Sequence, residues 1–370
     1  MINLTFKAPL RGIAGYGIAA RNILLELIKG KDSCLSVKSI PWLNKTYGGD
    51  TENWPLIYNI MRSKPDFAKE DSNLLYISIA KEFCGREKHA SVYGYSFFET
   101  SSLPGDWIKG CNSVDVMLVP SKFNLETFKY AGVRVPMEIV PFGVDTNFYK
   151  PDYKSFTNIP EKFTFLSIAQ VTPRKGCELI IKAFLECFGT NKDVQLVLRW
   201  YFNHDKNDHL QIKNFIRSIR KEIKILNEGN ILLIPTIHET QMPALYASSH
   251  VLVAPFRGEG WGLPIIEALA CEIPVICTNW GGVTEFLNKD FGILLDYQLA
   301  RVPPNTIMDV SGEHFWAEPN YEQLKASMMK VYNDYIIYKA KAVAAREFLI
   351  QNFQWKHTAE KLVNVLKKWD

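Results

Sequence analysis

Two glutamates eight positions apart are the residues of this chain best suited to accepting hydrogen bonds from a ligand. Glu259 lies in a run with three glycines, and Glu267 lies in an apolar stretch. The apolar run 251–256 before them predicts a buried strand, and Pro264 predicts the first turn of a helix. Open α/β sheets bind ligands at the carboxyl ends of their strands, beside helix N-termini that attract anions. The pattern therefore predicts a site for a polyhydroxylated, phosphorylated ligand.

A pair of cations forms a second candidate. Arg174 and Lys175, in the turn 173–176, follow the strand-like run 163–169 and precede a helical pattern. A guanidinium fork and a compact ammonium both suit a diphosphate. Taken alone, a solvated basic turn explains these residues better. The diphosphate interpretation prevails because the glutamate loop follows another strand of the same predicted sheet.

A glycine-rich turn at 12–17 forms a third candidate, because it follows a predicted strand at 2–9 and precedes a predicted helix at 18–29. Such a turn can bring a helix N-terminus to a phosphate. The Gly-x-Gly-x-x-Gly spacing of dinucleotide sites, the P-loop and the Gly-x-Ser-x-Gly elbow are all missing from the sequence. His and Cys do not have zinc spacing, and there is no Asp-x-Asp motif. We therefore expect no cofactor and no metal, with positive side chains and helix ends stabilising charge.

Composition narrows the class of protein. The 370 residues are 47% hydrophobic, which is enough for two domains, and 43 basic against 39 acidic residues argue against nucleic acid as a partner. Seven cysteines without a Cys-x-x-Cys pair indicate a reduced, cytoplasmic protein. No run approaches the roughly 20 apolar residues of a membrane span, although peripheral membrane contact is still allowed. The helix predicted at 211–226 has an isoleucine face flanked by basic residues, and core packing explains it better than a membrane surface.

Strand-like and helical runs alternate along most of the chain, which favours doubly wound parallel sheets. The polar stretch 143–162 separates two such series, and a helical segment, broken near 352–355, ends the chain. The expected strands are 2–9, 74–79, 92–97, 115–119 and 137–141, then 163–169, 194–199, 230–234, 250–255, 274–277 and 292–295. The sequence thus predicts an α/β protein of two Rossmann-like domains facing across a cleft.

The segment 258–270 resembles the Glu-x7-Glu signature of the retaining family 4 glycosyltransferases, the glycosyl transferases group 1, which have the GT-B fold. Weaker matches in the same order extend the resemblance over nearly the whole chain. They are 119–124, 132–133, 141–145, 274–276, 281–285 and 316–319. The resemblance implies an acceptor-binding domain at 1–155, a nucleotide-sugar-binding domain at 156–345, and a C-terminal helix at 346–370 that packs back on the first domain.

The resemblance also implies a role for each candidate residue. Glu267 is expected to hold the ribose hydroxyls, and Lys175 with Arg174 to neutralise the diphosphate. The donor sugar is expected at Glu259 and at the backbone of Gly260, Trp261, Gly262 and Leu263. Gly15, Tyr16 and Gly17 would bring the first helix to the diphosphate, and Glu99 is the nearest candidate for a polar group on the sugar or acceptor side. The family has an arginine where this chain has Gln170, and the hypothesis is that Arg174 replaces it.

These expectations predict a metal-independent hexosyltransferase. It would move a hexose or deoxyhexose, with retention, from a nucleoside-diphosphate sugar to a glycan, lipid-linked or protein-linked acceptor. GDP-mannose or a related GDP-sugar is the favoured donor, and UDP-hexoses are the alternative. Two other classes stay open, a non-catalytic nucleotide-sugar or glycan binder on the same scaffold and a phosphorylase or epimerase of the same fold.

Overall fold

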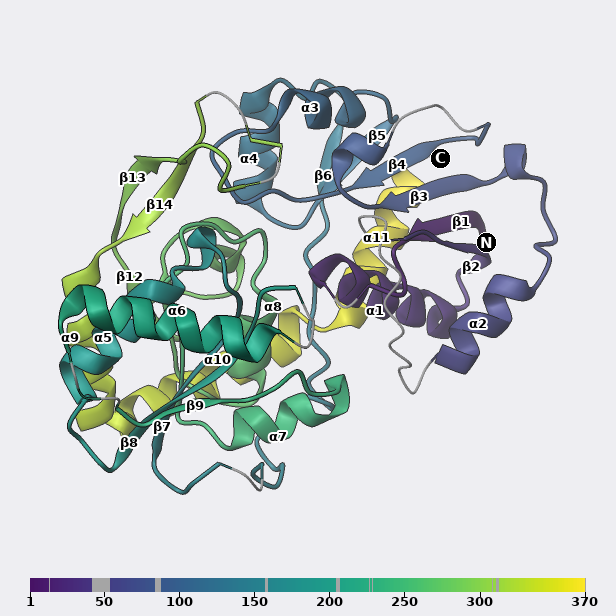
Figure 1. The fold of residues 1–370 in the computed structure, drawn as a ribbon. Helices are drawn as coiled ribbons and strands as arrows, with labels where there is room; N and C mark the ends of the chain where they lie inside the picture. The colour runs from purple at the N-terminus through teal and green to yellow at the C-terminus, as the bar shows by residue number, and fades with distance from the viewer. Residues whose placement is uncertain are drawn as a thin grey trace. The chain divides into compact units, whose positions relative to one another are not determined.

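The structure is a computed structural model in which the chain forms two compact units. Unit 1 comprises Met1–Gly143 and Asn352–Asp370, and unit 2 comprises Val144–Gln351. The described residues are 1–12, 14–41, 54–83, 88–156, 159–203, 207–225, 227, 229–307, 309–310 and 313–369. Each unit is built on a six-stranded parallel sheet, and each is described by itself (Figure 1).

The sheet of unit 1 consists of short strands that are mostly buried. In spatial order they are β2 (Ser33–Ser39), β1 (Ile2–Ala8), β3 (Asn73–Ile77), β4 (Val92–Tyr95), β5 (Val116–Val119) and β6 (Met137–Ile139). Every neighbouring pair is parallel. Continuous apolar runs such as β5, Val-Met-Leu-Val, form strands covered on both faces, which is typical of parallel sheets.

Helices connect these strands. They are α1 (Gly15–Gly30), α2 (Trp54–Arg62), α3 (Gly105–Cys111) and α4 (Lys122–Ala131), with short 3-10 turns η1 (Lys69–Asp71) and η2 (Ala80–Glu82). At the start of α4 the Ser121 side chain accepts a hydrogen bond from the Asn124 backbone N–H, and the helix ends at Gly132 in the left-handed conformation. Both ends of α4 are therefore specified locally by the sequence.

The last helix of the chain, α11 (Trp355–Trp369), belongs to unit 1 and packs against α1 (Figure 1). The Tyr93 hydroxyl donates to the Leu366 carbonyl at 3.4 Å, and Lys368 and Trp369 both reach Glu138, at 2.5 and 3.1 Å. The predicted return of the C-terminal helix to the first half of the chain is confirmed.

Unit 2 repeats the architecture. Its strands, in spatial order, are β12 (Ile293–Leu295), β11 (Val275–Thr278), β10 (Val251–Ala254), β7 (Phe163–Gln170), β8 (Val194–Tyr201) and β9 (Ile231–Leu233). All neighbouring pairs are parallel. Its helices are α5 (Cys177–Phe188), α6 (Asp208–Ile223), α7 (Met242–Ala247), α8 (Leu263–Ala270), α9 (Tyr321–Asn333) and α10 (Tyr335–Asn352), and its 3-10 turns are η3 (Pro173–Lys175), η4 (Glu239–Gln241) and η5 (Gly281–Glu285).

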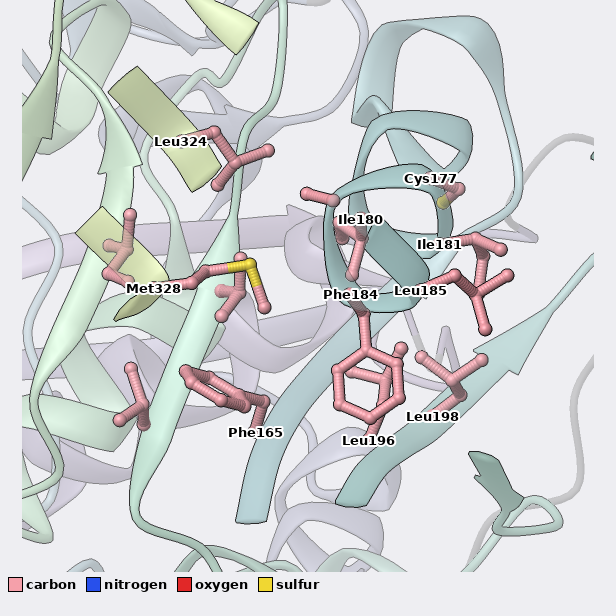
Figure 2. Close-up of a cluster of buried hydrophobic side chains, with 14 of the residues drawn as sticks. Phe165, Cys177, Ile180, Ile181, Phe184, Leu185, Leu196, Leu198, Leu324 and Met328 are labelled. Carbon is pink, nitrogen blue, oxygen red and sulfur yellow. The ribbon is translucent and has the colours of Figure 1, made fainter. Parts of the chain in front are cut away.

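A large apolar core lies on one face of this second sheet. Figure 2 shows Phe165 of β7 and Leu196 of β8 among side chains from α5 and from α9, including Phe184 and Met328. Ile212, Ile216 and Ile219 of α6 belong to the same core, which is the ordinary packing expected for that helix. In the part of the chain that the structure describes, no helix is both long and apolar enough to cross a membrane.

Two strand features of the structure were not predicted from the sequence. One is β2, whose sequence Ser-Cys-Leu-Ser-Val-Lys-Ser alternates with polar residues because the strand lies at the edge of its sheet and only Val37 is fully buried. The other is an antiparallel hairpin in unit 2, formed by β13 (Tyr297–Arg301) and β14 (Phe315–Pro319). The prediction of two doubly wound α/β units is otherwise confirmed.

Candidate active site

The order of the strands in unit 2 creates a crevice at one place. From β7 the chain continues to β8 and β9 on one side, and it then returns to β10 on the other side, where β10 pairs with β7. Such a reversal leaves a crevice outside the carboxyl ends of the two central strands, where ligands of open α/β sheets bind. The turn with Arg174 and Lys175 follows β7, and the loop with Glu259 follows β10. The fold therefore brings both predicted segments to this crevice.

At the crevice, Lys175 and Glu259 form an ion pair in which the Nζ donates to Oε2. Arg174 Nη1 donates to the Gly258 carbonyl at 2.7 Å, so the basic turn holds the loop through both of its cations. Burial by itself raises the pKa of Glu259, but the charges of Lys175 and Arg174 outweigh it and hold that pKa below its ordinary value. Glu259 is therefore an ionised carboxylate at neutral pH.

The loop around Glu259 is packed backbone against backbone. The Gly282 N–H donates to the Glu259 carbonyl at 2.9 Å. Gly281 has φ of +79°, and a Cβ there would lie 2.2 Å from the Glu259 carbonyl oxygen. Because only glycine fits this position, η5 can approach the loop closely and fix its backbone. The segment 281–285, which carries part of the resemblance, thus supports the loop.

The backbone that was predicted to face the donor sugar leads into α8. Gly260 is buried, Gly262 is the residue before the helix, and Leu263 begins it. The Trp261 ring is buried against Phe286, with ring centroids 5.2 Å apart. Trp261 thus anchors the loop with its ring, and the role of its backbone at the donor sugar stays a prediction.

Glu267 lies one turn further along α8, in a different environment. Glu267 is 7% exposed, and its carboxyl accepts a hydrogen bond from the Tyr246 hydroxyl at 2.8 Å. Its pKa is raised to about 8, mainly by burial and also by the charge of Glu239, whereas Tyr246, Tyr149 and Arg199 oppose the rise. The two glutamates of the signature therefore differ in ionisation at neutral pH.

Arg257 connects three elements around the site, and the sequence did not indicate this role. Its Nη2 donates to Glu178 of α5 at 2.6 Å, and its guanidinium forms a two-point contact with Glu318 of β14 at 2.5 and 2.8 Å. Its Nη1 donates to the Pro173 carbonyl at 2.5 Å, and its backbone N–H donates to the Arg174 carbonyl at 2.7 Å. Burial lowers the pKa of Arg257, but the two carboxylates outweigh it and raise the pKa above its ordinary value. Arg257 thereby fixes the basic turn relative to the glutamate loop and the hairpin.

The remaining candidates lie in unit 1. Gly15, Tyr16 and Gly17 begin α1 directly after the turn that follows β1, and β1 is likewise the strand at which the order of that sheet reverses. The Tyr16 ring stacks on Phe97, with centroids 4.1 Å apart, and its hydroxyl lies 2.9 Å from the Ser96 hydroxyl. Glu99, in the same loop after β4, is partly buried and close enough to Tyr16 to help raise the pKa of that tyrosine, although burial is the main cause.

The structure thus assembles the predicted residues into two groups. Arg174, Lys175, Glu259 and Glu267 lie around the crevice of unit 2, and the residues of the 15–17 turn lie beside Glu99 in unit 1. Gln170, which stands where the family has an arginine, donates from its side chain to the Phe202 carbonyl at 3.0 Å. Within the described ranges, no three His, Cys, Asp or Glu side chains gather as metal ligands, and metal independence stays a prediction.

The comparison with known families agrees with this site. Residues 150–300 match the family described as glycosyl transferases group 1. The chain contains a group 1 glycosyltransferase domain. The match covers the basic turn, the glutamate loop and the strands that position them, so the family resemblance seen in the sequence is confirmed.

Individual relatives are distant. Over 312 residues, 79% of this chain and 73% of the relative, the chain is 24% identical to a GDP-mannose-dependent monoacylated alpha-(1-6)-phosphatidylinositol monomannoside mannosyltransferase of Corynebacterium glutamicum. It is 38% identical over 132 residues to O-antigen chain mannosyltransferase B of Escherichia coli, but this segment is only 35% of the chain and 32% of that protein.

A solved structure shows the same fold. The crystal structure of Anabaena HepE in complex with UDP and glucose superimposes with a TM-score of 0.68 at 14% identity, covering 99% of this chain and all of HepE. The two parallel-sheet units are therefore those of the GT-B fold that the sequence predicted.

Proposed function

We propose that this group 1 glycosyltransferase moves a hexose or deoxyhexose from a nucleoside-diphosphate sugar to a hydroxyl acceptor, with retention of configuration. The observation that carries the proposal is the Lys175–Glu259 ion pair at the crevice between β7 and β10. It supports the proposal because a cation is the group that would stabilise a leaving diphosphate, and the ionised carboxylate beside it would accept hydrogen bonds from sugar hydroxyls.

In this proposal each charged group has one task. Lys175 and Arg174 stabilise the negative charge that develops on the diphosphate as the glycosidic bond breaks, which is where a preorganised cation contributes most. Glu259 positions the sugar, and the leaving phosphate takes the acceptor proton on the same face, so no protein nucleophile is required. Glu267, with Tyr246 beside it, holds the ribose hydroxyls. The Gly15–Gly17 turn is proposed to contact the diphosphate and Glu99 the sugar or acceptor, with no metal and no cofactor.

The donor is proposed to be a GDP-sugar, with GDP-mannose first. The name of the Corynebacterium relative specifies GDP-mannose, whereas HepE was crystallised with UDP and glucose, so UDP-hexoses are the competing donors. The acceptor is proposed to be a glycan or a lipid- or protein-linked sugar, because the names of the two mannosyltransferase relatives specify a phosphatidylinositol mannoside and an O-antigen chain.

The test is release of nucleoside diphosphate from GDP-mannose and from UDP-glucose, with and without simple mannoside acceptors. Lys175→Met should lower kcat about 100- to 1000-fold, the usual cost of removing one preorganised electrostatic group. The matched control is Lys182→Met, which removes a lysine paired with Glu222 on the surface of the same unit and should leave kcat unchanged. Tight donor binding without turnover in the wild type would instead favour the non-catalytic binder.

Retention and the role of Glu259 need separate measurements. NMR of the product should show the anomeric configuration of the donor. Glu259→Gln should raise KM for the donor and lower kcat, because an amide replaces a carboxylate that pairs with Lys175. If Glu259→Gln transfers sugar at the full rate, the positioning role is wrong.

A further inference from the structure

Arg199, on β8 in unit 2, differs in its hydrogen bonding from Arg21, Arg257 and Arg346. It is partly buried, and its Nε is buried and donates to no acceptor among the residues that the structure describes. By contrast, Arg21 donates to two backbone carbonyls and Arg346 to three, and Arg257 is paired with two carboxylates. A buried donor without an acceptor is unfavourable, so a ligand that supplies acceptor atoms would relieve that cost.

The direction of Arg199 follows from the alternation of side chains along β8. Leu196, Leu198 and Trp200 belong to the core with α5 and α6, so Arg199 lies on the opposite face of the sheet. Its partner in the register is Ile168 of β7. Arg199 thus stands one strand away from β7, on the side of β7 that is away from β10 and the Glu259 loop.

Arg199 interacts electrostatically with the second glutamate of the signature. Its charge acts on Glu267 and on Tyr246, whereas the cations that act most on Glu259 are Lys175 and Arg174. The two glutamates therefore have separate cationic neighbours. The order of groups in a nucleotide sugar is sugar, diphosphate, ribose and base. If the sugar is bound at Glu259 and the ribose at Glu267, a cation that acts on Glu267 and stands on the strand beyond β7 is a candidate to meet the base, the group on the far side of the ribose.

The guanidinium also contacts an aromatic ring of its own strand. Its Cζ lies 5.4 Å from the centroid of the Tyr201 ring, which is within the range of a cation–π contact. A guanidinium has five N–H donors, so such a contact does not use up its capacity for hydrogen bonds. Because arginine has donors and no acceptor, it must meet acceptor atoms of the ligand, not ribose hydroxyl protons.

We propose that Arg199 binds the nucleobase of the donor and that its planar fork favours guanine. Guanine presents O6 and N7 side by side as two acceptors, which match two parallel N–H donors of one arginine. Uracil has no such adjacent pair, since a protonated ring nitrogen separates its carbonyl oxygens. This inference rests on the proposed function, because it takes Glu267 as the ribose site, and it makes Arg199 a specificity-determining residue of that site.

The experiment measures the affinity of the wild type, Arg199→Lys and Arg199→Ala for GDP, UDP and 7-deaza-GDP by calorimetry. Both variants should bind GDP about 5- to 150-fold more weakly, the range that corresponds to loss of a bidentate arginine–guanine pair. UDP affinity should change by less than about threefold, and 7-deaza-GDP, which lacks the N7 acceptor, should bind the wild type more weakly than GDP does. Arg217→Ala, which removes an exposed arginine of α6, is the matched control.

Two results would overturn the inference. One is an equal loss of affinity for GDP and UDP in both Arg199 variants, which would indicate a phosphate contact. The other is unchanged GDP affinity in both variants. Arg199→Lys keeps the charge, so it guards against a fold defect in the alanine variant, and circular dichroism of both checks the fold. Sugar transfer by the wild type is assayed in parallel. If the wild type transfers sugar but the Arg199 variants bind GDP as tightly as the wild type does, this inference is refuted and the proposed function is not.

Discussion

Replacement of Glu267 by glutamine should make the stability of the protein less dependent on pH. The pKa of Glu267 is raised by burial from its ordinary 4.5 to about 8, so the folded protein holds a proton that the unfolded chain releases. The stability associated with this proton is fully present below pH 4.5 and is lost as the pH rises toward 8. Glutamine is neutral at every pH, so the variant lacks this loss.

The magnitude follows from the size of the rise. One pKa unit corresponds to about 1.4 kcal/mol, so the stability lost relative to low pH is about 3 kcal/mol at pH 7 and about 5 kcal/mol well above pH 8. For a unit of this size, about 1 kcal/mol shifts Tm by roughly 2–4 °C. Relative to its value below pH 4.5, the Tm advantage of Glu267→Gln should therefore grow by roughly 2–4 °C at pH 5 and by roughly 6–12 °C at pH 7.

The assay is thermal unfolding of the wild type and Glu267→Gln from pH 5 to pH 9. The test is how the Tm difference between the variant and the wild type changes with pH. Any change in the hydrogen bond to Tyr246 adds only a Tm offset that does not vary with pH. Glu222→Gln, which changes a mostly exposed carboxylate of α6, should give a curve parallel to the wild type. A constant Tm difference between Glu267→Gln and the wild type at every pH would refute the reasoning.

Two further substitutions test how the site is held. Arg257→Lys should lower kcat at least about tenfold while the protein stays folded. A lysine cannot reproduce the fork that joins Glu318, Glu178 and the Pro173 carbonyl, and small displacements at reacting groups are costly. The control is Arg301→Lys, whose pair with Glu313 is exposed, and an equal loss of kcat in both variants in steady-state assays would show that the positioning role is wrong. Gly176→Ala should destabilise the protein by at least about 2 kcal/mol in urea unfolding, because φ is +62° and the new Cβ would lie 2.2 Å from the Pro255 carbonyl oxygen. The control is Gly105→Ala, whose new Cβ would meet open space. Equal stability of the two variants would contradict the prediction.

The sequence predicted the parts of the site whose residue types reveal their local structure. The loop around Glu259 was predictable because its glycines, the apolar run before it and Pro264 each have a local meaning. The helices whose apolar faces repeat regularly, such as α5 and α6, were predictable for the same reason. The strand β2 was not, because an edge strand needs few apolar residues and its serines and lysine have the composition of a loop.

What the sequence could not indicate depends on partners far away in the chain. Arg257 stands at the start of the signature, but its role comes from Glu178, 79 positions before it, and from Glu318, 61 positions after it. The hairpin that carries Glu318 was also not predicted. Arg199 likewise became a candidate only when the register of β8 placed it on the face opposite the core.

The two glutamates show why spacing alone could not assign their roles. Both are buried, and burial raises the pKa of each carboxyl. At Glu259 two cations from the turn after β7 reverse the effect, so the group is an anion paired with Lys175. At Glu267 the neighbours are tyrosine hydroxyls and a more distant arginine, so the carboxyl keeps its proton near neutral pH and can both donate and accept hydrogen bonds. A diol such as ribose offers both donors and acceptors, which suits the second environment, whereas charge that develops at a phosphate requires the cations of the first.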